Sequence, residues 1–165
     1  MIALQNVSKN FGNKILFEKI NLELEQGKIY GFVGKNGTGK TVLFKMISGF
    51  MSPSSGKIKV SNLEIGKDVD FPENCGLIIE SPGFVNNLSG YKNVKMLGDI
   101  RGVVTEEEIK KYFSIFKLDP EDKKKVKNYS LGMKQKIGLI QAFMEDPKIL
   151  ILDEPMKMIS SCYVT

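Results

Sequence analysis

A glycine-rich stretch in the first third of the chain has the residue types and spacing of a phosphate-binding loop. Residues 34–41 read GKNGTGKT and fit the pattern G-x-x-x-x-G-K-[ST]. Glycines let main-chain N–H groups close around a phosphate, and Lys40 adds a positive charge for the outer phosphates. The Thr41 hydroxyl is a suitable ligand for the Mg²⁺ that accompanies a nucleotide. The predicted phosphate-binding residues are Gly34, Asn36, Gly37, Thr38, Gly39, Lys40 and Thr41.

Two elements must position this loop. The apolar run at 29–33 predicts a strand that leads into it, and the sequence from Val42 predicts a helix that ends near Gly49. The positive N-terminal end of that helix is expected to face the phosphates. A plain glycine-rich turn between a strand and a helix is the alternative interpretation.

A pair of acids follows a second apolar run and supplies the partner that a phosphate loop needs. Residues 148–152 read KILIL, which predicts a buried strand, and Asp153 and Glu154 follow it directly. Asp153 is predicted to hold Mg²⁺, directly or through water. Glu154 is predicted to orient or deprotonate the water that attacks the γ-phosphate. The alternative is that both are ordinary acids at the end of a strand.

The rest of the pattern indicates an α/β body with a helical insertion. The run CGLII at 75–79 is typical of a sheet that is buried on both faces. From Ser89 to Phe116 the apolar spacing is helical, with a capping box at Thr105–Glu108. Ser130 is expected to cap a further helix that runs to about Met144. Further strands are expected at 1–7, 15–24 and 57–60, with a turn at 8–13.

Composition narrows the class of protein. The 165 residues suggest about one domain, and the net charge is +5, yet Arg101 is the only arginine. Readers of nucleic acid use arginine at base edges, so no nucleic-acid partner is expected. Cys75 and Cys162 lack metal-ligand spacing, which favours a reduced, cytosolic protein. No apolar run reaches about 18 residues, so the sequence predicts no membrane span.

Between the two motifs lies a stretch that points to a family. Residues 129–133 read YSLGM and follow the helical insertion. In this order of motifs the chain resembles, from Met1 to about Pro155, the nucleotide-binding subunit of ATP-binding cassette (ABC) transporters, whose signature is usually LSGGQ. The resemblance implies that Ser130 and Gly132 contact the γ-phosphate held by the opposite protomer of a homodimer that sandwiches ATP. A plain capped helix is the alternative interpretation.

The resemblance also assigns two less specific positions. Phe11 stands where the family has an aromatic residue that stacks on adenine, although a lone aromatic residue can equally belong to the core. Glu80 stands where the family usually has glutamine, the residue that senses Mg²⁺ and couples to the membrane subunit. The resemblance therefore gives Glu80 a catalytic and a metal-binding role. YSLGM together with Glu80 is similar to the branch that exports peptide antibiotics of the bacitracin or lantibiotic type, or gives immunity to them.

The resemblance implies a fold, partners and a location. The expected fold class is α/β, a P-loop NTPase core with an N-terminal antiparallel β subdomain and a helical insertion. The expected cofactors are ATP and Mg²⁺, and the expected partner is a separate membrane permease on whose cytoplasmic side the subunit lies. A soluble ABC ATPase of translation or DNA repair is a further alternative. The expected divisions are 1–82 and 129–155 for the core, 83–128 for the insertion and 156–165 for an aberrant tail.

The family pattern stops after Met156. Family members continue with a Leu-Asp loop and a later histidine, whereas residues 157–165 contain no such pair and the chain has no histidine. The sequence therefore predicts a truncated or frameshifted cassette that lacks the C-terminal part of the fold, with a genuinely short family member as the alternative. ATP hydrolysis by this chain stays open, because a nucleotide-binding remnant is also compatible with these motifs. A core with an edge removed predicts marginal stability.

Overall fold

The computed structural model describes residues 1–155, which fall into two compact units with the boundary between Glu73 and Asn74. The first unit carries the phosphate loop, and the second carries the acidic pair and the signature stretch. The predicted aberrant tail at 156–165 lies outside the described residues.

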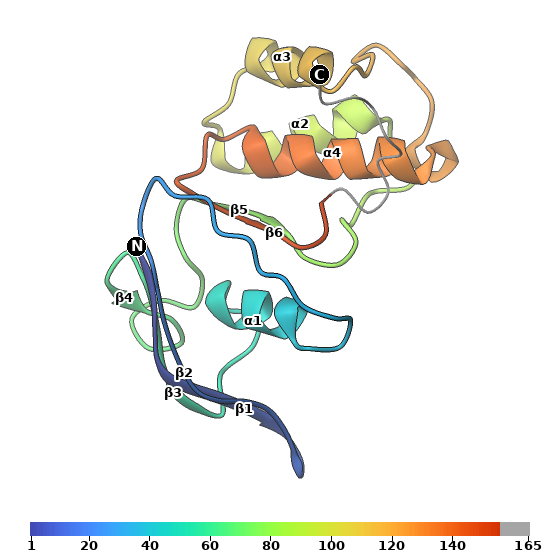
Figure 1. Ribbon diagram of the computed structural model, residues 1–165. Helices are drawn as coiled ribbons and strands as arrows, with labels where there is room; N and C mark the ends of the chain where they lie inside the picture. Colours follow the sequence, from blue (N-terminus) through green and yellow to red (C-terminus); the bar gives the residue numbers. More distant parts are fainter. Residues whose placement is uncertain (156–165) are drawn as a thin grey trace. The chain divides into compact units, whose positions relative to one another are not determined.

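The first unit is built on an antiparallel sheet of four strands in the order β2-β1-β3-β4 (Figure 1). The predicted inward residues of β3, Ile58 and Val60, are buried, and Val7 of β1 is buried with them. The sheet therefore forms the N-terminal antiparallel part of the expected fold. Its strands are β1 (Ile2–Phe11), β2 (Lys14–Leu24), β3 (Ser55–Val60) and β4 (Leu63–Glu64).

The predicted turn at 8–13 is wrong for most of its length, because β1 continues to Phe11. The register between β1 and β2 shifts near Val7 and Lys9, and Lys19 has a left-handed φ of 47°. At such a shift some backbone groups lose their partner on the neighbouring strand. Nearby side chains can bond these groups instead, so a polar stretch can continue as a strand. The Lys19 N–H donates to Ser8 Oγ at 2.9 Å. Phe11 is therefore a strand residue rather than a turn residue.

The predicted helix after the phosphate loop is confirmed as α1 (Lys40–Ile47), but the predicted strand before the loop is wrong. No strand among the described residues pairs with 29–33, and the side chains of Ile29 and Val33 are fully exposed. A strand exists only where a neighbour accepts its hydrogen bonds. Phe32 of this segment makes an edge-to-face ring contact with Phe44 of α1, with centroids 5.4 Å apart.

The second unit pairs two short parallel strands, β5 (Cys75–Ile78) and β6 (Ile149–Leu152). Apolar residues of α4 (Leu131–Phe143) pack on β5, where Ile78 lies in one cluster with Leu139 and Ala142. The expected burial of 75–79 on both faces is confirmed only in part: residues along β5 alternate between buried and half-buried, and Leu150 of β6 is 39% exposed. A sheet of two strands has too few neighbours to bury both faces.

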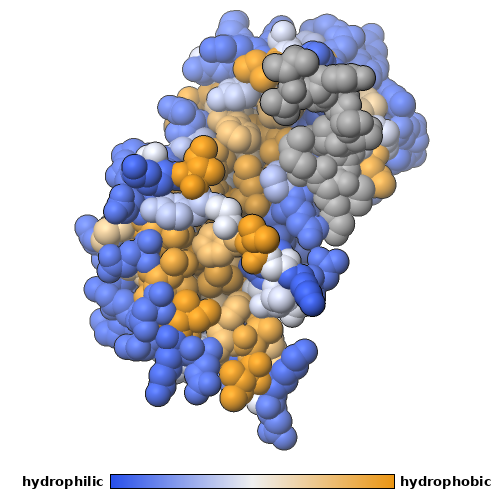
Figure 2. Space-filling model, viewed as in Figure 1, coloured by the Kyte–Doolittle hydropathy of each residue, from blue (hydrophilic) through white to orange (hydrophobic). Residues whose placement is uncertain are grey.

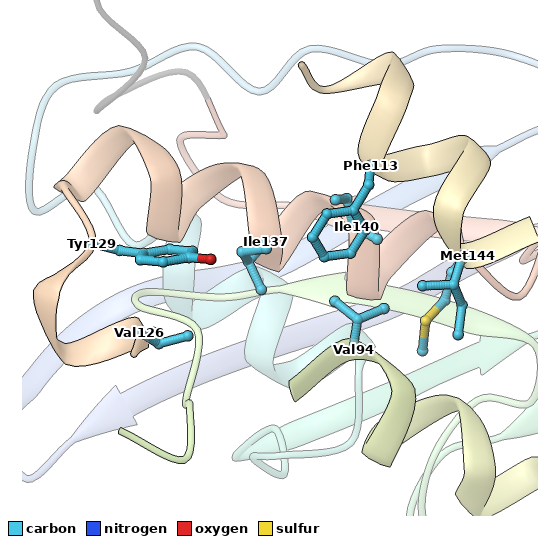
Figure 3. Packing of buried hydrophobic residues seen from close by; sticks show 8 residues of the cluster. Val94, Phe113, Val126, Tyr129, Ile137, Ile140 and Met144 are labelled. Carbon is cyan, nitrogen blue, oxygen red and sulfur yellow. The ribbon is translucent and has the colours of Figure 1, made fainter. Parts of the chain in front are cut away.

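Helices supply the main core of this unit. The helical insertion contains α2 (Gly90–Arg101), α3 (Glu106–Ile115) and the short 3₁₀ helix η1 (Val126–Asn128). The predicted capping box on α3 is present, since Thr105 and Glu108 bond each other's backbone N–H. Figure 3 shows the buried side chains that these helices and α4 bring together. They are Val94, Ile109, Phe113, Val126, Tyr129, Ile137, Ile140 and Met144.

Both units also carry apolar side chains at their surfaces, as Figure 2 shows in orange. Examples are Ile29 and Val33 in the first unit, and Ile100 and Val103 of the helical insertion in the second. None of the helices within residues 1–155 has the length and apolar character that crossing a bilayer requires.

Replacing Phe113 by alanine tests the core of the second unit. Phe113 is 0% exposed, so Phe113→Ala is expected to lower the free energy of unfolding by about 3–5 kcal/mol through lost burial and a residual cavity. Ile115 on the same helix is 59% exposed, and Ile115→Ala is expected to change it by less than about 0.5 kcal/mol. Urea unfolding followed by circular dichroism measures both. Equal effects of the two substitutions would contradict the assigned core.

Candidate functional site

The phosphate loop depends on glycines in the left-handed region. Gly37 has φ +81° and Gly39 has φ +95°. A Cβ atom added to Gly39 would lie 2.5 Å from Phe17 Cζ and 2.9 Å from Leu16 Cδ2. Strand β2 therefore packs directly against the end of the loop, and a side chain at Gly39 would force Phe17 and Leu16 to shift and would have to hold a left-handed backbone. The pattern G-x-x-x-x-G-K-[ST] predicts the glycine, whereas only the structure identifies Phe17 as its neighbour.

The loop is also fastened by its own side chains. Lys40 Nζ donates to the Gly34 carbonyl at 2.7 Å and to the Lys35 carbonyl at 3.0 Å. Thr38 Oγ1 donates to the Lys35 carbonyl at 2.9 Å. The ammonium of Lys40 is thus held across the loop, and it keeps a third proton with which it can meet a phosphate oxygen.

The residues of the loop fit a bound phosphate group. Gly39 is the N-cap of α1 and no side chain caps this helix. The first N–H groups of a helix have no partner within it, and the helix dipole favours an anion at that end. The lysine, the left-handed glycines and the helix end therefore form a cradle for a phosphate.

Phe11 lies at the end of β1, opposite Lys14 of β2, and its side chain is 49% exposed. The ammonium of Lys9 sits over its ring, 5.1 Å from the ring centroid. An aromatic ring at a strand end with this exposure belongs to the surface and not to the core. It can therefore offer a ring face to a planar ligand.

In the second unit, the parallel pairing of β5 and β6 brings three predicted acids to one edge of the sheet. Ile78 pairs with Leu152, so Glu80 and Glu154 each follow the last paired residue by two positions. Both have left-handed backbones, with φ 63° and φ 47°. Left-handed residues other than glycine are uncommon, and they persist only where the surrounding structure holds them in that conformation.

The third acid of this edge, Asp153, is buried. The residue is 8% exposed, and its backbone N–H donates to the Ile78 carbonyl at 2.7 Å. A buried carboxylate is costly unless a partner balances its charge. Carboxylate and hydroxyl oxygens are the ligands that Mg²⁺ prefers, so Asp153 and Glu80 are of a residue type that fits this ion, although no group of three or more acidic, histidine or cysteine ligands gathers within residues 1–155.

The signature stretch begins α4. Ser130 is exposed and is its N-cap, with Oγ accepting from the Met133 N–H at 3.2 Å. Gly132 lies in the first turn and adds no side chain that would cover the helix end. This geometry is shared by an anion site and by a plain capped helix.

Two hydrogen bonds fix the position of α4, and the sequence predicted neither of them. Gln135 Nε2 donates to the Pro155 carbonyl at 3.1 Å, which ties α4 to the chain just after the acidic pair. The hydroxyl of buried Tyr129 accepts from the Gly90 N–H at 3.3 Å, which ties the signature to the start of α2. Burial also raises the pKa of Tyr129, so the phenol stays neutral. The motif contains Tyr129, but nothing in the sequence marks Gln135.

These observations define the class. A lysine-closed phosphate loop at a helix N-terminus, in the first unit, and acids at the ends of parallel strands, in the second, are each features of a P-loop nucleotide-binding domain. The sequence profile of the family described as "ABC transporter" matches residues 17–157. The chain therefore belongs to the ABC transporter family and is an ATP-binding domain of that family.

Curated relatives narrow the likeness to one branch. The chain is 38% identical over 157 residues to the bacitracin transport ATP-binding protein BcrA of Enterococcus faecalis, covering 94% of this chain and 51% of the relative. It is 36% identical over 156 residues to the lantibiotic transport ATP-binding protein SrtF of Streptococcus pyogenes, covering 94% and 66%. The predicted resemblance is thus confirmed. The chain spans about half the length of the BcrA proteins that it matches.

Solved structures confirm the predicted fold class. An ATP-binding ABC transporter protein of Pyrococcus furiosus matches with a TM-score of 0.80 at 26% identity, covering 96% of this chain and 76% of that one. A dimeric bacterial ABC transporter cassette matches with a TM-score of 0.81 at 21% identity, which supports the fold alone. The α/β core, the antiparallel N-terminal sheet and the helical insertion are therefore those of an ABC ATPase.

Replacing Gly39 by alanine tests the packing of the loop on β2. The added Cβ would meet Phe17 and would hold a left-handed backbone, so Gly39→Ala is expected to weaken ATP binding at least about tenfold. Gly31→Ala is the matched control, because a Cβ there meets no atom within 4 Å. Isothermal titration with ATP measures both. Unchanged affinity in Gly39→Ala would show that the loop does not need this glycine.

Proposed function

We propose that this chain is the ATP-binding component of an ABC exporter, coupling ATP binding and hydrolysis to transport through a separate membrane permease. The observation that carries the proposal is the phosphate loop, in which Lys40 spans the carbonyls of Gly34 and Lys35 beside the uncapped end of α1. Relatives named for bacitracin and lantibiotic transport support a peptide antibiotic as the cargo.

The loop is proposed to hold the triphosphate. Its backbone N–H groups and Lys40 meet the phosphate oxygens, and Phe11 stacks on the adenine. Lysine suits this task because its compact ammonium acts as a point charge on the outer phosphates. The remaining contacts of the loop are assigned to Gly34, Asn36, Gly37, Thr38, Gly39 and Thr41.

Water activation is assigned to the second unit. Glu154, held in a left-handed conformation just after β6, is proposed to orient the attacking water and to accept its proton. Mg²⁺, when bound, neutralises charge on the phosphates, and its proposed ligands are Thr41, Asp153 and Glu80. Glu80, which lies just after the end of β5, is also proposed to be a catalytic residue.

Assembly and location follow from the same proposal. Ser130 and Gly132 are assigned to the γ-phosphate of a nucleotide held by a second copy, so the working unit is a homodimer. A related cassette has been solved as a dimer, which supports this assignment. A permease partner places the subunit at the cytoplasmic face of the membrane. The division into a core of 1–82 and 129–155 with an insertion at 83–128 belongs to this proposal.

A nucleotide-binding remnant without turnover is the second candidate, because the contacts of the phosphate loop serve binding and do not by themselves require hydrolysis. The remnant keeps the residues that bind ATP and differs from the first candidate only in that it does not hydrolyse ATP. Binding of ATP therefore supports both candidates, and release of phosphate separates them.

Two substitutions test the assigned roles. Lys40→Ala is expected to abolish ATP binding, because the loop loses its charge and two hydrogen bonds. Glu154→Gln is expected to keep ATP binding and to lower the hydrolysis rate by about 10²–10⁴-fold, because an amide cannot accept the proton. Equilibrium binding and phosphate release measure the two effects.

Glu107→Gln, at an exposed position on α3, is the control and is expected to leave both quantities unchanged. Unaltered ATP affinity in Lys40→Ala would overturn the proposed function. ATP binding by the unchanged chain without phosphate release would select the remnant.

A further inference from the structure

A lysine of β1, Lys9, is tied to the ring of Phe11 on one side and to the backbone on the other. Its Nζ lies 5.1 Å from the centroid of the Phe11 ring and donates to the Ser52 carbonyl at 2.8 Å. The two residues are two positions apart on one strand, so both point to the same face of the sheet. The ammonium is therefore anchored and covers one face of the ring.

The loop that anchors Lys9 is itself bonded to β1. The Ser54 N–H donates to the Ser8 carbonyl at 2.8 Å, and the Asn10 N–H donates to Ser54 Oγ at 3.1 Å. These bonds lie on either side of Lys9 in the sequence. The Ser52 carbonyl thus keeps a fixed place relative to the strand, and the lysine has little freedom to leave the ring.

The same part of the hairpin contacts the phosphate loop. Lys9 pairs with Phe17 across β1 and β2, and residues that face each other in a ladder project from the same side of the sheet. The ring of Phe17 occupies the space in which a side chain at Gly39 would lie. Lys9 and Phe11 therefore belong to the face of the hairpin that packs on the phosphate loop, all within the first unit.

We propose that Lys9 is a positioning residue for the purine base: it holds the Phe11 ring by one face and leaves the other face for adenine. This inference rests on the proposed function, in which Phe11 stacks on adenine. The negative face of an aromatic ring attracts a cation. A cation on one face also draws electron density from the ring, which lowers the repulsion between Phe11 and a base stacked on its other face. Lys9 then contributes to binding of the base, whereas Lys40 contributes to binding of the phosphates.

Comparing ATP with inorganic tripolyphosphate separates the two roles. In the full chain, Lys9→Met keeps the apolar stem and removes the cation, and it is expected to weaken ATP binding by about two- to fivefold. The affinity for tripolyphosphate, which has no base, is expected to stay unchanged. Lys9→Arg restores the cation and is expected to restore ATP affinity. Lys28→Met, at an exposed lysine of the same unit, is the control and is expected to change neither ligand.

Unchanged ATP affinity in Lys9→Met would overturn the inference, and so would equal weakening of both ligands, which would make Lys9 a phosphate contact or a fold determinant. Phe11→Ala distinguishes this failure from that of the proposed function. If Phe11→Ala weakens ATP but Lys9→Met does not, only the role of Lys9 is wrong. If neither changes ATP affinity, adenine does not stack on Phe11. Absence of ATP binding by the unchanged chain would overturn the proposed function itself.

Discussion

The close approach of β2 to the phosphate loop is the constraint on which the first unit depends. Phe17 and Leu16 lie where a side chain at Gly39 would be and its backbone is left-handed, so both the space and the conformation at this position favour a glycine. That conformation starts α1 at Lys40 and leaves the first N–H groups of the helix without a side-chain cap. A helix end that suits an anion is thus a consequence of how a hairpin packs against a glycine. The same hairpin carries Phe11 and Lys9, so one packing contact organises both the phosphate loop and the proposed site for the base.

In the second unit the corresponding constraint is parallel pairing. Because Ile78 and Leu152 lie side by side, the acids that follow them emerge at one edge of the sheet. The left-handed backbones of Glu80 and Glu154 are conformations that a free chain avoids, and the surrounding structure must hold them. The hydrogen bond from Gln135 to the Pro155 carbonyl is one such restraint, and it links the signature helix to the acidic pair. Packing of α4 on β5 and on the helical insertion therefore also sets the geometry of the acids.

Short-range patterns in the sequence predicted the elements whose causes are local. The capping box at Thr105, the cap at Ser130 and the glycine-lysine loop each depend on residues within one turn of the chain, and the structure contains all three. The predicted strands β1, β2, β3, β5 and β6 are also present, but two predictions that depended on a distant partner failed. The run 29–33 is apolar enough for a strand but finds no neighbour among the described residues, and β1 extends through a polar stretch because β2 accepts its bonds. The hydropathy of a residue indicates whether it can be buried, but it does not indicate which backbone segment will pair with it.

Residue types and their order along the chain by themselves determined the family, the phosphate loop and the identity of the candidate acids. These follow from chemistry that needs particular side chains at fixed spacing, which is readable without coordinates. Only the tertiary structure decided that Phe17 closes on Gly39, that Lys9 covers one face of Phe11, and that Gln135 bonds the chain beyond Glu154. Each of these contacts joins residues that are apart in sequence or depends on a side-chain direction. A contact of this kind exists only when strand register and helix packing bring both partners to one place, and a linear pattern carries no signal for that meeting.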